Sequence, residues 1–325
     1  YGKRIFARRM VFSVSVKSYA KVNLSLNISG VQGGYHAIDS VVANIDLYDT
    51  VRARARKDRL VNVYMRGRGS EQIPPEQNHA VRAGEAFVAA FGTFGADIEI
   101  DKDIPIGAGL GGSSADAAGV LNALAKLYKV EDREALKALA DGLGSDTGYM
   151  LGGGFARLSG RGTRVQPLAS PRRYDMLLFL PASPVSTAAC YRRYDAAPDP
   201  LRADSARLAS ALQAGDFAGV AANVYNALQR PACELNPEVA AALAAAASFS
   251  PAAHAVTGSG SAVFALFESE ELCRWAHSRW KGKMCARVVH TLVPGERRRG
   301  LPNPFVLVQE EPDAEKRRKD GREKS

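Results

Sequence analysis

The first part of the chain alternates between apolar and polar residues, which is the pattern of half-buried strands. Residues 13–28 read SVSVKSYAKVNLSLNI. After a turn at Gly33–Gly34–Tyr35–His36, the apolar run 41–47 and the alternating segment 49–55 continue the pattern, and 61–65 fits a further strand. We therefore predict that the chain opens with a series of strands that build a sheet.

Helical spacing of apolar residues then appears repeatedly and alternates with shorter strand-like runs. Helices are predicted at 78–91, 132–143, 203–213, 216–229, 237–247 and 269–280, the last with Ser269 as its N-cap. Strands are predicted at 96–100, 155–158, 174–180, 255–267 (with a central turn) and 285–292. We expect a break at 144–148, a loop after residue 180, and a domain boundary in the turn-rich stretch 159–171. This mixture predicts an α+β fold.

Residues 104–124, IPIGAGLGGSSADAAGVLNAL, combine a glycine-rich loop with the start of a helix. Four glycines fall within residues 107–112, directly after a predicted strand. Glycines let a ligand approach the backbone, and the free N–H groups and dipole of the following helix attract anions. Such loops also serve tight packing alone. Ser113 and Ser114 favour a phosphate site, because a hydroxyl there either caps the helix or reaches a phosphate oxygen or a metal.

Two familiar phosphate motifs do not describe this loop. No Lys follows the glycines, so the G-x-x-x-x-G-K-[ST] motif is absent. The G-x-G-x-x-G spacing is met formally, but no second strand ending in an acidic residue follows the helix. The helix itself is predicted from apolar residues at Val120, Leu121, Leu124 and Leu127.

Four further polar clusters stand out, and each has a structural interpretation as well as a functional one. Lys21 and Asn23 are two residues apart in a strand and share one face, which is either solvated or part of a site. Asp146 lies in a glycine turn, where an aspartate usually acts as a cap. Tyr35–His36 follow a glycine hinge, and the small-residue turn 257–261 is either a plain hairpin or a close neighbour of the glycine loop.

The order of these clusters along the chain resembles that of the GHMP kinases, small-molecule kinases named for galactose, homoserine, mevalonate and phosphomevalonate. The segments AKVNLSL, GGYHAIDSVVANIDLYD and LGSDTGYMLGGG are more particularly similar to those of the 4-diphosphocytidyl-2-C-methyl-D-erythritol kinases. The resemblance covers about residues 15–292. It implies an α+β, two-domain fold with a ribosomal-S5-domain-2-like N-terminal domain (10–165) and a ferredoxin-like α/β-plait C-terminal domain (166–292). A charged tail, expected to be disordered, would follow at 293–325.

The resemblance also implies roles for individual residues. Asp146 would accept the proton of the attacking hydroxyl beside Lys21, whose charge favours the ionised carboxylate. Asn23 would orient the alcohol, Tyr35 and Tyr191 would clamp a cytosine ring, and His36 would hydrogen-bond the base. The residues that would hold ATP are Pro105, Gly107, Ala108, Gly109, Leu110, Gly111, Gly112, Ser113 and Ser114, with Asn78 near the adenine. Either Ser113 or Ser114 would help to place Mg²⁺.

The implied reaction is ATP-dependent phosphorylation of the 2-hydroxyl of 4-diphosphocytidyl-2-C-methyl-D-erythritol, a step of non-mevalonate isoprenoid synthesis. A GHMP kinase for another small alcohol and a non-catalytic ligand-binding relative are the alternatives. The chain departs from the family pattern after Asp146, where Thr147–Gly148 replace Val-Pro, at Gly33, which replaces an acidic residue, and at 225–229, which lacks the usual acids. The loop after Asp146 is therefore expected to be repositioned.

Composition and charge limit which binding partners and which cellular compartment we expect for this chain. Of the net charge of +9, five charges lie in residues 1–17 and a surplus of two in 291–325, which leaves +2 for the body. This distribution argues against nucleic-acid binding. No run approaches the roughly 18 apolar residues of a membrane span, and the start lacks the apolar core of a signal peptide. The four cysteines form no C-x-x-C pair, so we expect buried thiols in a cytoplasmic protein. The sequence leaves both a monomer and a homodimer open.

Overall fold

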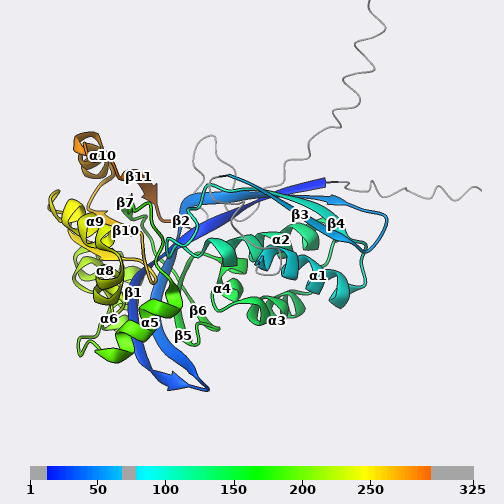
Figure 1. The fold of residues 1–325 in the computed structure, drawn as a ribbon, viewed down its shortest axis with the longest axis horizontal. Helices are drawn as coiled ribbons and strands as arrows, with labels where there is room; N and C mark the ends of the chain where they lie inside the picture. The colour runs from blue at the N-terminus through cyan, green and yellow to red at the C-terminus, as the bar shows by residue number, and fades with distance from the viewer. Residues whose placement is uncertain (1–12, 68–77, 294–325) are drawn as a thin grey trace, which may run out of the picture.

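The computed structural model describes residues 13–67 and 78–293. Residues 294–325 of the expected tail, and most of the loop expected at 67–75, lie outside the described residues. In Figure 1 the long hairpin of β1 and β2 runs between helices α1–α4 on one side and a second sheet with its own helices on the other. The hairpin therefore contributes to both parts of the molecule.

The first sheet has the strand order β3-β4-β2-β1-β8, with β5 paired to β2 and β6 paired to β5. Its strands are β1 (Ser13–Gln32), β2 (Tyr35–Ala55), β3 (Val61–Arg66), β4 (Ala96–Asp101), β5 (Phe155–Gly160), β6 (Arg164–Leu168) and β8 (Tyr225–Asn226). The separate strands predicted at the start of the chain are thus two long, continuous strands. Register shifts at Tyr19/Lys21, Asn23/Ser25 and Ile28/Gly30 interrupt their pairing, and such bulges let a strand bend and re-aim its side chains.

Helices α1 to α4 lie on one side of this sheet, where α1 and α2 contact its strands and α3 packs on the other helices (Figure 1). Their bounds are α1 (His79–Phe91), α2 (Gly112–Tyr128), α3 (Arg133–Leu143) and α4 (Thr147–Gly152). The apolar stripe predicted for the helix after the glycine loop is confirmed, since Val120, Leu121, Leu124 and Leu127 are all buried. The break expected at 144–148 is only partly present, because α4 already begins at Thr147.

The second sheet has the order β11-β7-β10-β9 with antiparallel pairing throughout. Its strands are β7 (Asp175–Leu180), β9 (Ala253–Val256), β10 (Val263–Phe267) and β11 (Cys285–His290). Helices α5 (Thr187–Ala196), α6 (Ser205–Ala214), α7 (Phe217–Ala222), α8 (Gln229–Leu235) and α9 (Pro237–Ala247) follow β7, and α10 (Glu270–Arg279) joins β10 to β11. A strand, helices, two strands, a helix and a strand make up the ferredoxin-like arrangement, which confirms the predicted fold of this half.

Three local predictions were wrong or only partly right. The loop expected after residue 180 covers only 181–186, because α5 begins at Thr187, where Ser186 caps it by accepting a hydrogen bond from the Ala189 N–H. The helix predicted at 216–229 is divided into α7, β8 and α8, because β8 pairs in parallel with Ser25 and Leu26 of β1. Strand β6 lies within the stretch expected to be turn-rich, where it completes a hairpin with β5.

One hydrophobic cluster joins the two sheets. It contains Val41 and Leu110 from the first half and Tyr174, Leu178 and Phe264 from the second. The expected boundary at residues 165/166 therefore crosses a shared core.

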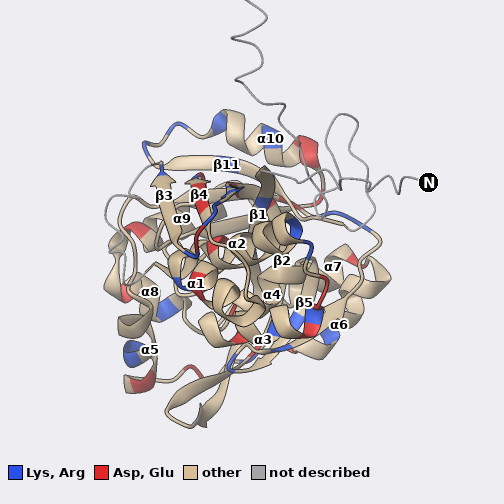
Figure 2. Cartoon of the chain, turned by 90° about the vertical axis from the view of Figure 1, so that its right-hand side faces the viewer, with Lys and Arg blue, Asp and Glu red and all other residues tan. Residues whose placement is uncertain are grey.

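The remaining composition-based predictions have mixed outcomes. Cys190 and Cys273 are buried free thiols as expected, Cys233 is half-buried, and Cys285 is exposed, so the expectation was wrong for Cys285. Figure 2 shows Lys and Arg interspersed with Asp and Glu over the face it presents. Within the described ranges, no helix is long and apolar enough to cross a membrane.

Candidate active site

A cavity of about 870 Å³ lies where the glycine loop, β1, the start of α4 and α5 meet. Every residue singled out from the sequence lines it. These residues are Lys21, Asn23, Tyr35, His36, Asn78, Pro105, Gly107, Ala108, Gly109, Leu110, Gly111, Gly112, Ser113, Ser114, Asp146 and Tyr191. Segments more than 150 residues apart in sequence thus contribute to one site.

The glycine loop is held by its backbone from both sides. The Ala108 carbonyl accepts a hydrogen bond from the Ala262 N–H, and the Leu110 carbonyl accepts one from the Lys21 N–H, both at 3.0 Å. The side chains of Ala108 and Leu110 are buried. Gly109 has φ +77°, and a Cβ there would lie 2.2 Å from the Thr257 carbonyl oxygen. Glycine is therefore required at this position by both conformation and space.

The turn at 257–261 is the close neighbour of the glycine loop and not a plain hairpin. A Cβ on Gly258 would lie 2.8 Å from the Gly109 carbonyl oxygen. The Ser259 hydroxyl lies 2.9 Å from the Thr187 hydroxyl at the start of α5. This turn therefore connects the glycine loop to the helix that carries Tyr191.

Helix α2 begins without a side-chain cap. Its N-cap is Gly111, in the left-handed conformation, and no side chain accepts from its first turn. The suggestion that Ser113 or Ser114 caps the helix was wrong, since both lie inside the first turn. Helices leave their first N–H groups without intrahelical partners, so here these donors and the positive end of the dipole are directed at the cavity.

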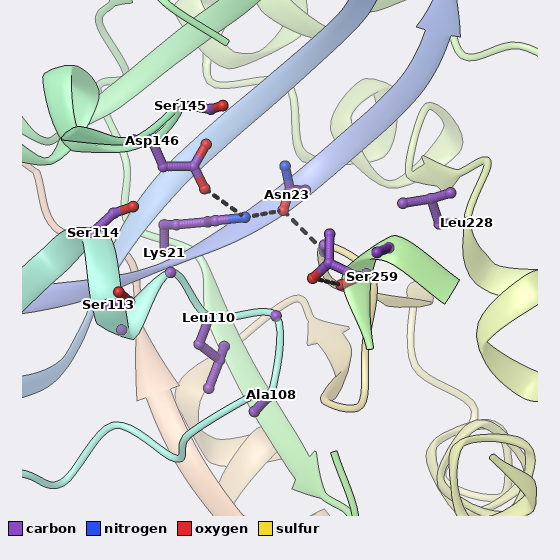
Figure 3. Close-up of a pocket in the computed structure, with 18 of the residues that line it drawn as sticks. Lys21, Asn23, Ala108, Leu110, Ser113, Ser114, Ser145, Asp146, Leu228 and Ser259 are labelled. Atoms are coloured by element: carbon purple, nitrogen blue, oxygen red, sulfur yellow. Dashed lines mark hydrogen bonds and ion pairs between the residues drawn. The ribbon is translucent and has the colours of Figure 1, made fainter. Parts of the chain in front are cut away.

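Lys21, Asn23 and Asp146 form a polar cluster above the loop (Figure 3). The Lys21 ammonium donates to Asn23 Oδ1 at 2.6 Å and lies 3.4 Å from Asp146 Oδ2. The side chain of Lys21 is 6% exposed and that of Asp146 is 27% exposed. A buried ammonium requires such partners, so the solvent-face interpretation of Lys21 and Asn23 was wrong. Register shifts of β1 lie on either side of this pair, and such irregularities can re-aim side chains.

The Asn23 amide is occupied by protein groups. Its Oδ1 also accepts from the Gly258 N–H at 3.0 Å and from the Thr257 hydroxyl at 3.3 Å, and its Nδ2 donates to Ser40. Asn23 therefore links the lysine to the turn behind the glycine loop. Asp146 precedes α4 without capping it, and the Thr147–Gly148 departure leaves its carboxylate within ion-pair distance of Lys21.

The aromatic residues lie at the other end of the cavity. Tyr35 and His36 open β2 at the hairpin tip, and Tyr191 and Asp195 are one turn apart on α5. The rings of His36 and Tyr191 are stacked with centroids 4.5 Å apart. His36 Nε2 donates to Asp195 Oδ1 at 2.7 Å, because a carboxylate can only accept. Tyr35 is 55% exposed and does not contact Tyr191 in a stacked pair; Arg161 lies over its ring instead.

Asn78 lines the cavity, and its Oδ1 caps α1 by accepting a hydrogen bond from the Ala80 N–H. A buried charge cluster, which includes Lys102 and Asp116, also lines the cavity. The Lys102 ammonium donates to Asp49 and, at 2.6 Å, to Asp116 Oδ2. Burial raises the pKa of Asp116 to about 8, because Lys102 offsets this only in part and Asp49 adds negative charge. Asp116 Oδ1 is buried with no hydrogen-bond partner among the described residues.

The sequence reasoning missed several residues of this cavity. Lys102, Asp116, Arg161 and Asp195 line it and were not singled out. Asp116 carried a usable signal, since it is a lone charge among the buried alanines of α2. Arg161 carried a weaker one, since it lies between two glycines directly after a predicted strand.

A second group of ionisable side chains lies away from the cavity. Asp175, Glu270 and His290 bring ligand atoms within 4.8 Å of one another. Arg173 pairs with both Asp175 and Glu270, and Arg274 also pairs with Glu270. Because these guanidinium groups already neutralise the carboxylates, the group is an ion-pair network and not a cation site.

Comparisons with known proteins agree with this geometry. The family models "GHMP kinases N terminal domain" and "GHMP kinases C terminal" match residues 78–155 and 208–274. A 4-diphosphocytidyl-2-C-methyl-D-erythritol kinase of Cutibacterium acnes is 37% identical over 259 residues, which are 76% of this chain and 84% of the relative. The enzyme of the same name from Desulfitobacterium hafniense is 35% identical over 87% of this chain and 97% of its own length.

Solved structures are similar to this chain over most of its length. A crystal structure of 4-(cytidine 5'-diphospho)-2C-methyl-D-erythritol kinase has a TM-score of 0.71 at 31% identity and covers 85% of this chain and 98% of that chain. A homoserine kinase from Cytophaga hutchinsonii shares the fold, with a TM-score of 0.67 at 18% identity over 89% of this chain and 98% of its own. The chain belongs to the GHMP kinases and, within them, to the 4-diphosphocytidyl-2-C-methyl-D-erythritol kinase family.

Proposed function

We propose that this chain transfers the γ-phosphate of ATP to the 2-hydroxyl of 4-diphosphocytidyl-2-C-methyl-D-erythritol. The observation that carries the proposal is the Lys21–Asp146 pair, which lies in the same cavity as the uncapped start of α2. One end of that cavity presents backbone donors suited to ATP phosphates, and the other presents aromatic rings suited to a base. The acceptor hydroxyl would lie between them.

Phosphoryl transfer depends mainly on positioning and on stabilising charge. Asp146 would accept the proton of the attacking hydroxyl, because its carboxylate is partly exposed to the cavity and not used as a helix cap. Lys21 would hold the carboxylate in place and stabilise the negative charge that develops on the transferred group. Asn23 would position Lys21 rather than the alcohol, since its oxygen already accepts three hydrogen bonds.

The residues at the start of α2 fit a magnesium ion bound together with ATP. Mg²⁺ retains several waters and takes few protein ligands besides phosphate oxygens. The hydroxyls of Ser113 and Ser114 lie in the first turn of α2 and line the cavity, and the Asp146 carboxylate lines the same space. When bound, the ion would neutralise charge on the β- and γ-phosphates.

The base of the acceptor would stack on Tyr35, with Tyr191 as the second ring. Because Nε2 of His36 is engaged with Asp195, its Nδ1 is left to meet the edge of a base. The adenine of ATP would enter beside Asn78, which lines the cavity at the start of α1.

The proposal is tested with the purified full chain, ATP and Mg²⁺ in an assay that couples ADP release to NADH oxidation. We expect turnover with the cytidylyl substrate and none with homoserine or mevalonate, and phosphorus NMR of the product should show a new phosphomonoester. Asp146→Asn should lower kcat by about 10²- to 10⁴-fold, the range for loss of a catalytic base. Turnover of another alcohol but not of the cytidylyl substrate would refute the assignment.

A further inference from the structure

The turn between β5 and β6 brings an arginine into the cavity at a place that sequence patterns assigned to a domain boundary. Arg161 lines the cavity and is exposed. It lies between Gly160 and Gly162, whose φ values are +65° and +94°. A Cβ on Gly162 would lie 3.3 Å from the Ser145 carbonyl oxygen. The turn therefore packs against Ser145, the residue before Asp146. Arg161 thus lies near the end of the cavity that contains Asp146.

Arg161 also reaches the aromatic end. Its guanidinium carbon lies 3.6 Å from the centroid of the Tyr35 ring. Because Tyr35 is 55% exposed, burial does little to hold this ring, and a guanidinium on its face is the contact that orients it. A ring has two faces, so a base can stack on the face that Arg161 does not cover.

The charged side chains that line the cavity also point to Arg161. Lys21 and Lys102 line the cavity but are paired with Asp146 and with Asp49 and Asp116. Arg161 and Arg192 are lining cations that form no ion pair with any carboxylate in the described ranges 13–67 and 78–293. Of these two, only Arg161 contacts Tyr35. An unpaired guanidinium between a base platform and a phosphoryl-transfer centre is suited to a diphosphate, which it can bind through two parallel hydrogen bonds.

We propose that Arg161 is a specificity-determining residue of the acceptor site, where it supports Tyr35 and binds the diphosphate of a nucleoside diphosphate ester. This inference rests on the proposed function, because it assigns the diphosphate to the acceptor and not to ATP. It predicts that Arg161 distinguishes acceptors that carry a diphosphate from those that carry the base alone.

The test compares binding of CDP and of cytidine to the full chain by isothermal titration calorimetry. In Arg161→Ala the affinity for CDP should fall about 10- to 100-fold, as for loss of a charged hydrogen bond. The affinity for cytidine should fall only about two- to fivefold, as for loss of the stacking on Tyr35. Arg161→Lys should recover part of the CDP affinity, since it restores the charge without the planar fork.

Arg164→Ala is the matched control, because it removes the same charge from the same hairpin at a residue that does not line the cavity. It should leave both affinities unchanged. Equal losses for CDP and cytidine in Arg161→Ala would overturn the diphosphate contact, and so would a selective loss of CDP affinity in Arg192→Ala but not in Arg161→Ala. Failure of the wild-type chain to phosphorylate the cytidylyl substrate would refute the proposed function separately, because the binding comparison needs no turnover.

Discussion

The two ends of the cavity are built in different ways. At the end where we propose that ATP binds, the glycine loop is held by backbone hydrogen bonds from Ala262 and Lys21 and contacts the turn at Gly258 closely. At the proposed acceptor end, the contacts are between side chains at the tips of two hairpins and on α5, and Tyr35 is more than half exposed. We therefore expect the backbone end to tolerate little change and the side-chain end to tolerate single substitutions that alter the preferred ligand.

The homoserine kinase that shares this fold is only 18% identical, so the fold survives broad replacement of side chains. In the present chain, changes at the backbone end should damage catalysis with every substrate. Changes at the acceptor end should alter the Michaelis constant for one substrate.

Among the changes that compare the two ends of the cavity, the largest effect is expected from Gly109→Ala. The new Cβ would lie 2.2 Å from the Thr257 carbonyl oxygen, in a residue whose φ is +77°, so the loop must shift. We expect kcat/KM for ATP to fall by about 100-fold or more, as for a misplacement of about 1 Å at a reacting centre. Gly142→Ala in α3 meets no atom of residues 13–67 or 78–293 within 4 Å and should be neutral or stabilising by up to about 1 kcal/mol. Steady-state kinetics and thermal melts of both variants check this, and normal ATP kinetics in Gly109→Ala would contradict it.

A somewhat smaller effect is expected from Asn23→Ala. The change leaves the Lys21 ammonium, the Gly258 N–H and the Thr257 hydroxyl without a shared acceptor. We expect kcat to fall by about 10- to 100-fold, with little change in KM for the acceptor, because Lys21 loses the oxygen that holds its ammonium beside Asp146 and misplacement at a reacting centre has an effect of about this size.

Asn62→Ala is the control for Asn23→Ala, since it removes a hydrogen bond to Asp97 outside the cavity. If Asn23→Ala instead raised the acceptor KM at constant kcat, Asn23 would orient the alcohol, as the family resemblance first implied.

The acceptor end is tested by Tyr35→Ala and Tyr191→Ala. Loss of one stacking ring should raise KM for the cytidylyl substrate by about 5- to 100-fold, because base stacking on an aromatic ring contributes about 1–3 kcal/mol. KM for ATP should stay the same, which the coupled assay measures directly. Tyr64→Ala removes an aromatic residue that is 56% exposed outside the cavity and should change neither constant. An unchanged acceptor KM in both cavity variants would exclude the aromatic clamp.

The smallest effect on turnover is expected from Asp116→Asn, because this change acts on the pH dependence of the free energy of unfolding. The folded state holds the Asp116 proton up to a pKa of about 8, whereas the unfolded chain releases it near its ordinary value. The folded state thus binds more protons, and the free energy of unfolding should fall as pH rises from about 4 to 8, by at most about 1.4 kcal/mol per unit. Asp116→Asn should remove this slope in urea unfolding measured between pH 6 and 9. The same slope in both proteins would refute the assignment.

The features that could be predicted from the sequence depend on residues close together in the chain. The glycine loop requires positive φ, the helix after it requires an apolar stripe, and Lys21 and Asn23 share a face by strand alternation. The features that could not be predicted depend on contacts distant in sequence. Strand β8 exists because it pairs with β1, some 200 residues earlier, and the His36–Asp195 hydrogen bond joins residues 159 positions apart.

The contact between the glycine loop and the turn at Gly258 constrains how this chain can diverge from its relatives. Gly109 and Gly258 face each other across the two halves, and Asn23 holds the same turn. A recombinant that joined residues 10–165 of one relative to 166–292 of another would have to inherit both sides of this contact together. We therefore expect a hybrid of two relatives to fold well only when the glycine loop and the turn at Gly258 come from the same parent.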